Sequence, residues 1–204
     1  MFLRTGGNVL LKFYDMLNLK TITAADSEAL SYIEGLYLQS FPPDERRPFD
    51  HIVAMLRRED SPFVMRLLCD DDRMVGFISC WEWPDMVYCE HFAVDPSTRG
   101  KGYGGEALRV LCGEINRPMV LEVECPGDEM SRRRIGFYQR SGFVLSTRPY
   151  VQPPYFDGAT PLPMYLMFYG APLQPGSESF DGYFDSVRDR LHRCVYGVEP
   201  GKYV

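Results

Sequence analysis

The chain has 204 residues, with 45% hydrophobic and 25% charged residues, which is the composition of an ordinary globular protein and excludes bulk disorder. Its formal net charge of −6 disfavours nucleic acid as a partner, because phosphate contacts need a basic surface. The six cysteines form no CxxC pair and only three histidines accompany them. We therefore expect no metal site, and reduced thiols in a cytoplasmic protein.

The N-terminal stretch is interrupted by Arg4, Lys12 and Asp15, so no apolar run long enough for a signal peptide is present. No window approaches 18 apolar residues, and we expect no membrane partner. We interpret residues 1–15 as a loose N-terminal extension and residues 16–169 as the main domain.

The spacing of apolar residues changes within the first half of the domain. Alternation over residues 18–24 predicts a strand, and apolar residues at spacings of three and four predict helices over 27–41 and 48–60. After residue 60, apolar residues recur at every second position and short polar turns separate the runs. This pattern predicts antiparallel strands over 63–69, 74–83 and 86–94.

The second half alternates between helices and strands. We expect a helix over 104–116, a strand over 118–125, a helix over 128–141 that ends at a positive-φ Gly142, and strands over 143–151 and 163–169. The predicted class is therefore α/β-mixed (α+β), with a largely antiparallel twisted sheet of about seven strands and helices on both faces.

Residues 170–204 begin with a linker, APLQPGSES, and continue as an amphipathic helix. Its apolar face is predicted to comprise Phe180, Tyr183, Phe184, Val187, Leu191 and Cys194. The first interpretation is that this helix packs back on the domain, and the alternative is a homodimer contact.

A glycine-rich loop, RGKGYGG, follows the strand that ends at Val94 and leads into a helix. Glycines let a ligand approach backbone N–H groups, and the helix adds its positive end, so the loop suits a pyrophosphate. Two side chains add positive charge. The candidate phosphate-binding residues are Arg99, Gly100, Lys101, Gly102, Tyr103, Gly104 and Gly105.

Two other sequence patterns are also typical of phosphate-binding loops. The P-loop string GxxxxGK[ST] is absent. The dinucleotide fingerprint GxGxx[GA] matches Gly102, Gly104 and Ala107, with Glu122 and Glu124 near the expected acidic position. That fingerprint directly follows the first strand of a parallel sheet, whereas antiparallel hairpins precede this loop, so a dinucleotide-binding protein is a minor alternative.

A third pattern, [RQ]-x-x-G-x-[GA], is met by Arg99, Gly102 and Gly104, and IGFYQRSGF over 135–143 matches FYxxxGF. With these two patterns about 35 residues apart and in this order, residues 18–169 resemble the GNAT superfamily of N-acetyltransferases. One departure is that Ser131 and Arg134 stand where family members often have Asn and Ala.

The resemblance implies an acyl-CoA N-acyltransferase-like fold, acetyl-CoA as co-substrate, no metal, and a small-molecule or protein amine as acceptor. It implies that amides of residues 100–105 hold the pyrophosphate. The strand edge at Phe92, Ala93 and Val94 would pair with the pantetheine arm, and the Val94 N–H would polarise the acetyl carbonyl.

Catalytic roles also follow from the resemblance. Tyr138 would protonate the departing thiolate. The attacking amine must lose a proton, and Glu90 is the first candidate base, with Glu124 and Glu122 in reserve. All three carboxylates could instead line an acceptor pocket. His91 alternates to the opposite face from Glu90 and is more simply structural.

The acceptor side is less defined. Trp81 and Trp83 share a strand face, and with Phe41, Tyr150 and Tyr155 they either wall an acceptor pocket or pack in the core. Acidic residues on that side would suit a cationic acceptor, and they are Asp44, Glu45, Glu82 and Asp85. The predicted function is N-acetyl transfer to a primary amine by direct attack. The alternative is a catalytically silent acyl-CoA-binding sensor or interaction module.

Overall fold

The structure of the chain, a computed structural model, describes residues 17–172, 175–177 and 179–203. The predicted extension over residues 1–15 lies outside the described residues, as do parts of the predicted linker.

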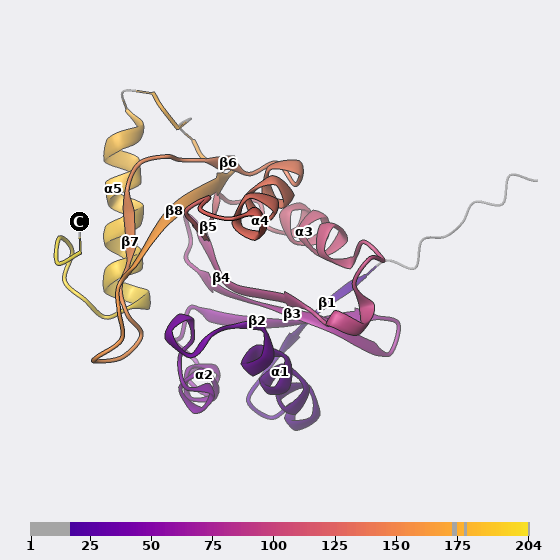
Figure 1. Cartoon of the computed structure of the whole chain (residues 1–204). Coiled ribbons are helices and arrows are strands. Elements are labelled where there is room, and N and C mark those ends of the chain that lie inside the picture. Colours follow the sequence, from indigo (N-terminus) through magenta and orange to yellow (C-terminus); the bar gives the residue numbers. More distant parts are fainter. Residues whose placement is uncertain (1–16, 173–174, 178, 204) are drawn as a thin grey trace, which may run out of the picture.

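Within the described residues one sheet has the order β1-β2-β3-β4-β5-β8-β6, with β7 paired to β8 (Figure 1). Only the β4–β5 pair is parallel, so the predicted largely antiparallel sheet is confirmed. The strands are β1 (Asn18–Ile22), β2 (Phe63–Asp70), β3 (Arg73–Glu82), β4 (Val87–Val94), β5 (Met119–Glu124), β6 (Val144–Leu145), β7 (Tyr150–Gln152) and β8 (Leu162–Tyr169).

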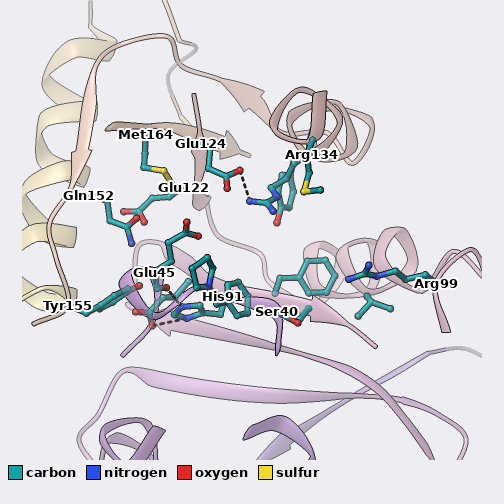
Figure 2. Close-up of a pocket in the computed structure, with 18 residues that line it drawn as sticks. Ser40, Glu45, His91, Arg99, Glu122, Glu124, Arg134, Gln152, Tyr155 and Met164 are labelled. Carbon is teal, nitrogen blue, oxygen red and sulfur yellow. Dashed lines mark hydrogen bonds and ion pairs between the residues drawn. The ribbon is translucent and has the colours of Figure 1, made fainter. Parts of the chain in front are cut away.

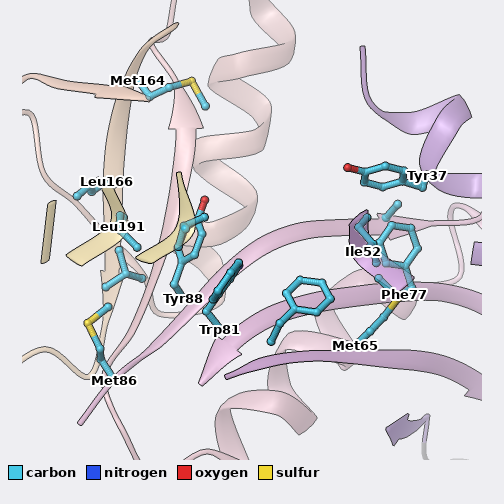
Figure 3. Packing of buried hydrophobic residues seen from close by; sticks show 14 of the residues in the cluster. Tyr37, Ile52, Met65, Phe77, Trp81, Met86, Tyr88, Met164, Leu166 and Leu191 are labelled. Carbon is cyan, nitrogen blue, oxygen red and sulfur yellow. The ribbon is translucent and has the colours of Figure 1, made fainter. Parts of the chain in front are cut away.

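Helices cover both faces of this sheet, as predicted (Figure 1). The helices are α1 (Ser27–Ser40), α2 (Phe49–Leu56), α3 (Tyr103–Glu114), α4 (Glu129–Arg140) and α5 (Phe180–Arg190). One buried cluster joins α1, α2 and α5 to the sheet, with Tyr37, Phe77 and Leu191 fully buried in it (Figure 3). A second cluster packs α3 and α4 against the other face.

The segment predicted as one strand over 143–151 forms two short strands, β6 and β7, which gives eight strands instead of about seven. Both pair with β8, but the chain bulges between them. The Arg148 N–H donates to the Ser146 hydroxyl at 3.3 Å, and Pro149 has no N–H to offer a ladder. This local turn, which alternation alone does not reveal, divides the strand.

The parallel pairing of β4 with β5 covers only three residue pairs, from Val87–Met119 to Cys89–Leu121. Beyond Cys89 the strands diverge, and β4 from His91 to Val94 pairs with β3 alone. The sheet is therefore forked at its centre, and the fork leaves one edge of β4 open.

Helix α4 has well-defined ends. Asp128 and Ser131 form a reciprocal capping box, so Ser131, where the GNAT pattern often has Asn, has a structural role here. At the other end Gly142 has φ +91°, as predicted, and a Cβ there would lie 3.1 Å from the Tyr169 ring. These caps fix the helix that carries Tyr138.

The C-terminal helix packs back on the domain, the first of the two interpretations. Phe180 and Phe184 are buried, and their rings lie 5.2 and 6.3 Å from the ring of Phe168 on β8. Cys194 is exposed, however, although it was predicted on the buried face. Residues Leu191–Val195 form a π-helical turn (η3), which turns Val195 inward instead.

Candidate functional site

Two adjoining cavities open at the fork between β4 and β5. The loop cavity, about 540 Å³, is lined by residues of the glycine-rich loop. The carboxylate cavity, about 420 Å³, is lined by residues that include four glutamates, namely Glu45, Glu90, Glu122 and Glu124 (Figure 2). Phe92, Val94, Arg99, Arg134 and Tyr138 line both cavities. One molecule can therefore extend from the loop into the carboxylate cavity.

The loop cavity is built from backbone. Gly100 and Gly102 have φ of +83° and +84°, and Gly102 begins α3 without a side-chain cap. A Cβ on either glycine, or on Gly105, would project into open space. The amides of the first turn of α3 are thus accessible to an anion, and the exposed Arg99 and Lys101 lie beside them. This cradle fits the pyrophosphate of a CoA ester.

The open edge of β4 continues this surface. The His91 N–H donates to the Ser79 hydroxyl at 3.2 Å, and the Asp95 N–H donates to the Val75 carbonyl at 2.9 Å, so both face β3. Because strand residues alternate, Phe92 and Val94 direct their N–H and C=O groups into the fork. Ala93, predicted with them, directs its carbonyl toward Gly76 of β3 and contributes no hydrogen-bonding group to this edge.

Tyr138 stands between the two cavities. Its ring packs edge-on against Phe143, with centroids 5.8 Å apart, and among the described residues its hydroxyl has no hydrogen-bond partner. Burial raises the pKa of Tyr138 above its ordinary value, so the hydroxyl keeps its proton at neutral pH. It is a proton donor without a partner, placed where a molecule would pass between the cavities.

Although Glu90 is one of the residues that line the carboxylate cavity, its side chain has no solvent-exposed surface. The carboxylate accepts hydrogen bonds from Arg47 Nη2 at 2.6 Å and Trp81 Nε1 at 2.8 Å. Burial acts to raise the pKa of Glu90, but Arg47, His91 and the Trp81 hydrogen bond together outweigh it and hold the pKa below its ordinary value. The geometry therefore does not fit the predicted role of Glu90 as a direct base.

Arg47 was not singled out from the sequence, although it lies in the charged FPPDERRP segment. Besides Glu90 it donates to the carbonyl of Val195 at 3.2 Å and lies 4.6 Å from the centroid of the Tyr155 ring. This one side chain links the α1–α2 loop, β4 and the C-terminal segment.

Glu122, a reserve candidate, lies on β5 just past the last residue paired with β4. Its carboxylate accepts hydrogen bonds from three tyrosine hydroxyls, those of Tyr88, Tyr150 and Tyr196. Burial raises the pKa of Glu122 to about 7, although these hydrogen bonds act in the opposite direction. Glu122 is thus a cavity-lining carboxylate that titrates in the neutral range.

Two other glutamates, Glu45 and Glu124, line the same cavity (Figure 2). Glu124 forms an ion pair with Arg134 at 2.6 Å. Arg134, which stands where the GNAT pattern often has Ala, therefore has a structural partner in this chain. Burial and the nearby charge of Glu124 raise the pKa of Glu45. His91 is buried, with a lowered pKa, and its Nε2 contacts the Glu45 carbonyl at 3.2 Å, so it is a neutral structural residue.

The aromatic residues predicted for the acceptor side divide between the two interpretations. Phe41 and Tyr155 line the carboxylate cavity, whereas Trp81 and Trp83 stack on each other away from it. Tyr150 reaches the site only through Glu122.

The predicted acidic residues divide in the same way. Only Glu45 lines the cavity. Glu82 pairs with Arg66 and Arg117, and Asp85 pairs with Arg190.

In the described part of the chain, no group of three or more His, Cys, Asp or Glu side chains could hold a metal ion. No helix among the described residues is long and apolar enough to cross a membrane.

The sequence and fold of the chain are similar to those of known proteins. The model of the acetyltransferase (GNAT) family matches residues 28–143. A GNAT-family acetyltransferase of Bacteroides thetaiotaomicron is 42% identical, with a TM-score of 0.81 over 89% of this chain and 99% of its own. No curated protein matches the chain.

More distant solved structures share the fold alone. A variant spermidine N-acetyltransferase of Vibrio cholerae is 15% identical, with a TM-score of 0.57 over 75% of this chain and 94% of its own. A ribosomal-protein alanine N-acetyltransferase of Escherichia coli is 18% identical, with a TM-score of 0.52 over 78% of this chain and 99% of its own.

Proposed function

Since the chain belongs to the GNAT acetyltransferase family, we propose that it moves an acetyl group from acetyl-CoA to a primary amine by direct attack. The observation that carries the proposal is the shared wall of the two cavities, where Tyr138 and the open edge at Val94 meet. A donor held in the loop cavity would present its thioester to an acceptor in the carboxylate cavity.

The donor would be held by backbone groups. The amides of residues 100–105 would bind the pyrophosphate, with Arg99 and Lys101 adding charge. The pantetheine arm would pair with Phe92 and Val94 as an added strand. The Val94 N–H would then polarise the acetyl carbonyl.

The leaving group needs a proton, and Tyr138 would supply it. A phenol stays protonated at neutral pH, and burial strengthens that preference here. Of the predicted bases, Glu90 would have to leave its Arg47 pair to act directly, so we assign it to the cavity wall. Glu124 stays a candidate for contact with the acceptor.

The acceptor would be a cationic amine, because Glu45, Glu122 and Glu124 contribute negative charge to the cavity. Both a small molecule and a protein side chain or terminus fit this description. The solved relatives named above include enzymes for each kind, a polyamine and a ribosomal protein.

A reducing compartment such as the cytoplasm is consistent with the cysteines. All six are free, including Cys80 and Cys89, whose sulfur atoms lie only 3.7 Å apart in the core.

The test is an acceptor screen with detection of free CoA thiol, together with thermal unfolding in the presence of acetyl-CoA or NAD. Acetyl-CoA should raise Tm by mass action and NAD should not. Donor binding without transfer to any amine would favour the silent sensor, and NAD binding without CoA binding would overturn the family-based proposal.

A further inference from the structure

Glu122 is enclosed by hydroxyl groups that come from three separate parts of the chain. Oε2 accepts hydrogen bonds from Tyr196 at 2.7 Å and from Tyr88 at 2.9 Å, and Oε1 accepts one from Tyr150. A carboxylate offers about four acceptor sites. Three are filled, so Oε1 keeps one site for a further proton donor, and the residue lines the carboxylate cavity.

We propose that Tyr196 is a positioning residue: its hydroxyl holds the carboxylate of Glu122, the reserve candidate base, ionised and in place to take the proton of the attacking amine. The inference rests on the proposed acetyl transfer. As the amine forms the new C–N bond, its proton passes to Oε1 of Glu122. The C–S bond breaks, and the sulfur takes its proton from Tyr138. Both side chains then exchange protons with water.

The position of Tyr196 follows from the π-helical turn after α5. The Tyr196 N–H donates to the Leu191 carbonyl at 3.2 Å, a bond between residues five apart. The wider turn includes the buried Leu191, and after it the Tyr196 hydroxyl reaches Glu122 on β5. Its ring lies 5.1 Å from that of Tyr155, another residue that lines the cavity.

The charges around Glu122 do not stabilise its ionised form, so that form depends on the tyrosine hydroxyls. Among the described residues no cation pairs with Glu122. The nearby charge of Glu90 on β4 raises the pKa of Glu122, although Arg47 partly offsets that charge. Glu124 on the same strand pairs with Arg134. Hydrogen bonds from Tyr88, Tyr150 and Tyr196 are therefore what stabilises the ionised form.

The loss of one tyrosine hydroxyl changes the pKa of Glu122 in a direction that can be predicted. The hydrogen bonds favour the carboxylate over the carboxylic acid, so their removal raises the pKa of Glu122. Less of the base is then ionised at low pH, while at high pH it is ionised in both proteins. The Tyr196→Phe variant should therefore lose activity mainly on the acidic side.

The experiment compares Tyr196→Phe with Tyr183→Phe, which loses a hydroxyl from α5 that has no hydrogen-bond partner in the part of the chain that the structure describes. With one acceptor throughout, the ratio of variant to wild-type kcat/KM is followed from pH 6 to 9.5, so that titration of the acceptor cancels. For Tyr196→Phe the ratio should be about tenfold lower at pH 6 than at pH 9.5, the loss expected for one hydrogen bond to a charged group. For Tyr183→Phe the ratio should be flat.

A second readout needs no turnover. Carbon-13 NMR of labelled glutamate carboxyls, assigned with Glu122→Gln, should show Glu122 titrating near neutral pH and its midpoint moving upward in Tyr196→Phe alone. A flat activity ratio with an unmoved midpoint, or Glu122→Gln with wild-type kcat/KM, overturns the inference. The predicted NMR shift in a protein that acetylates no amine would instead overturn the proposed function.

Discussion

The two halves of the site are assembled in different ways. The proposed donor side, which lies between Phe92 and Tyr138, depends on backbone groups, on positive φ at Gly100 and Gly102, and on one helix end. The proposed acceptor side is built from side chains of five separate segments, which contribute Arg47, Glu90, Glu122, Tyr155 and Tyr196. Local backbone requirements leave a pattern in the sequence, whereas a network of distant side chains does not.

The largest expected effect concerns the acceptor side. Arg47→Met leaves Glu90 buried without its ion partner, so we expect the free energy of unfolding at pH 7 to fall by about 3–5 kcal/mol, measured by urea denaturation. The matched control is Arg58→Met, which breaks an exposed pair with Asp60 and should change little.

The same pair has a pH signature. Because the pKa of Glu90 is lowered in the folded state, the stability it contributes is present above its ordinary pKa and is lost as the pH falls. The difference between wild type and Arg47→Met should therefore shrink in acid. A difference that is absent at pH 7 would mean that this side is not held together by the pair.

The next effect tests the boundary between the two sides. Tyr138→Phe keeps the ring that packs on Phe143 but removes the proton, so turnover should fall by about 100-fold at saturating acetyl-CoA. Donor affinity and Tm should stay near wild type. A turnover within twofold of wild type would remove Tyr138 from the mechanism.

A smaller effect is expected on the donor side. Gly102→Val places a side chain over the first turn of α3 and should weaken acetyl-CoA binding by about tenfold or more, measured by calorimetry. Gly158→Val is the matched control, since Gly158 has a similar φ of +91° in open space but lies outside both cavities. Equal affinity losses would point to general strain.

The smallest effect concerns the mouth of the acceptor side. Glu124→Gln removes one cavity charge while the side chain keeps its shape, and we expect KM for a cationic acceptor to rise by about threefold at low salt. The increase should fade as salt is added. An effect on acetyl-CoA affinity of the same size would place Glu124 on the donor side.

The sequence predicted the element order, the glycine-rich loop and Gly142 because each depends on local periodicity or on a positive φ. It did not predict the break at Ser146–Arg148, which depends on a side-chain hydrogen bond, or the π-helical turn that exposes Cys194. The sequence pattern places Glu90 and Glu122 on strands but does not reveal the partners of their carboxylates. Arg47, which pairs with Glu90, is 43 residues away from it in the sequence.

The short β4–β5 pairing has a mechanical consequence. Only three residue pairs join the two half-sheets at the Val87–Cys89 seam, and a donor added as a strand, as we propose, would need about 4.8 Å beside β4 beyond it. The C-terminal segment bridges the two halves, because Val195 accepts a hydrogen bond from Arg47 on one side and Tyr196 donates one to Glu122 on the other. In the proposed function this segment thereby helps to set the width of the donor slot, although it does not line the loop cavity.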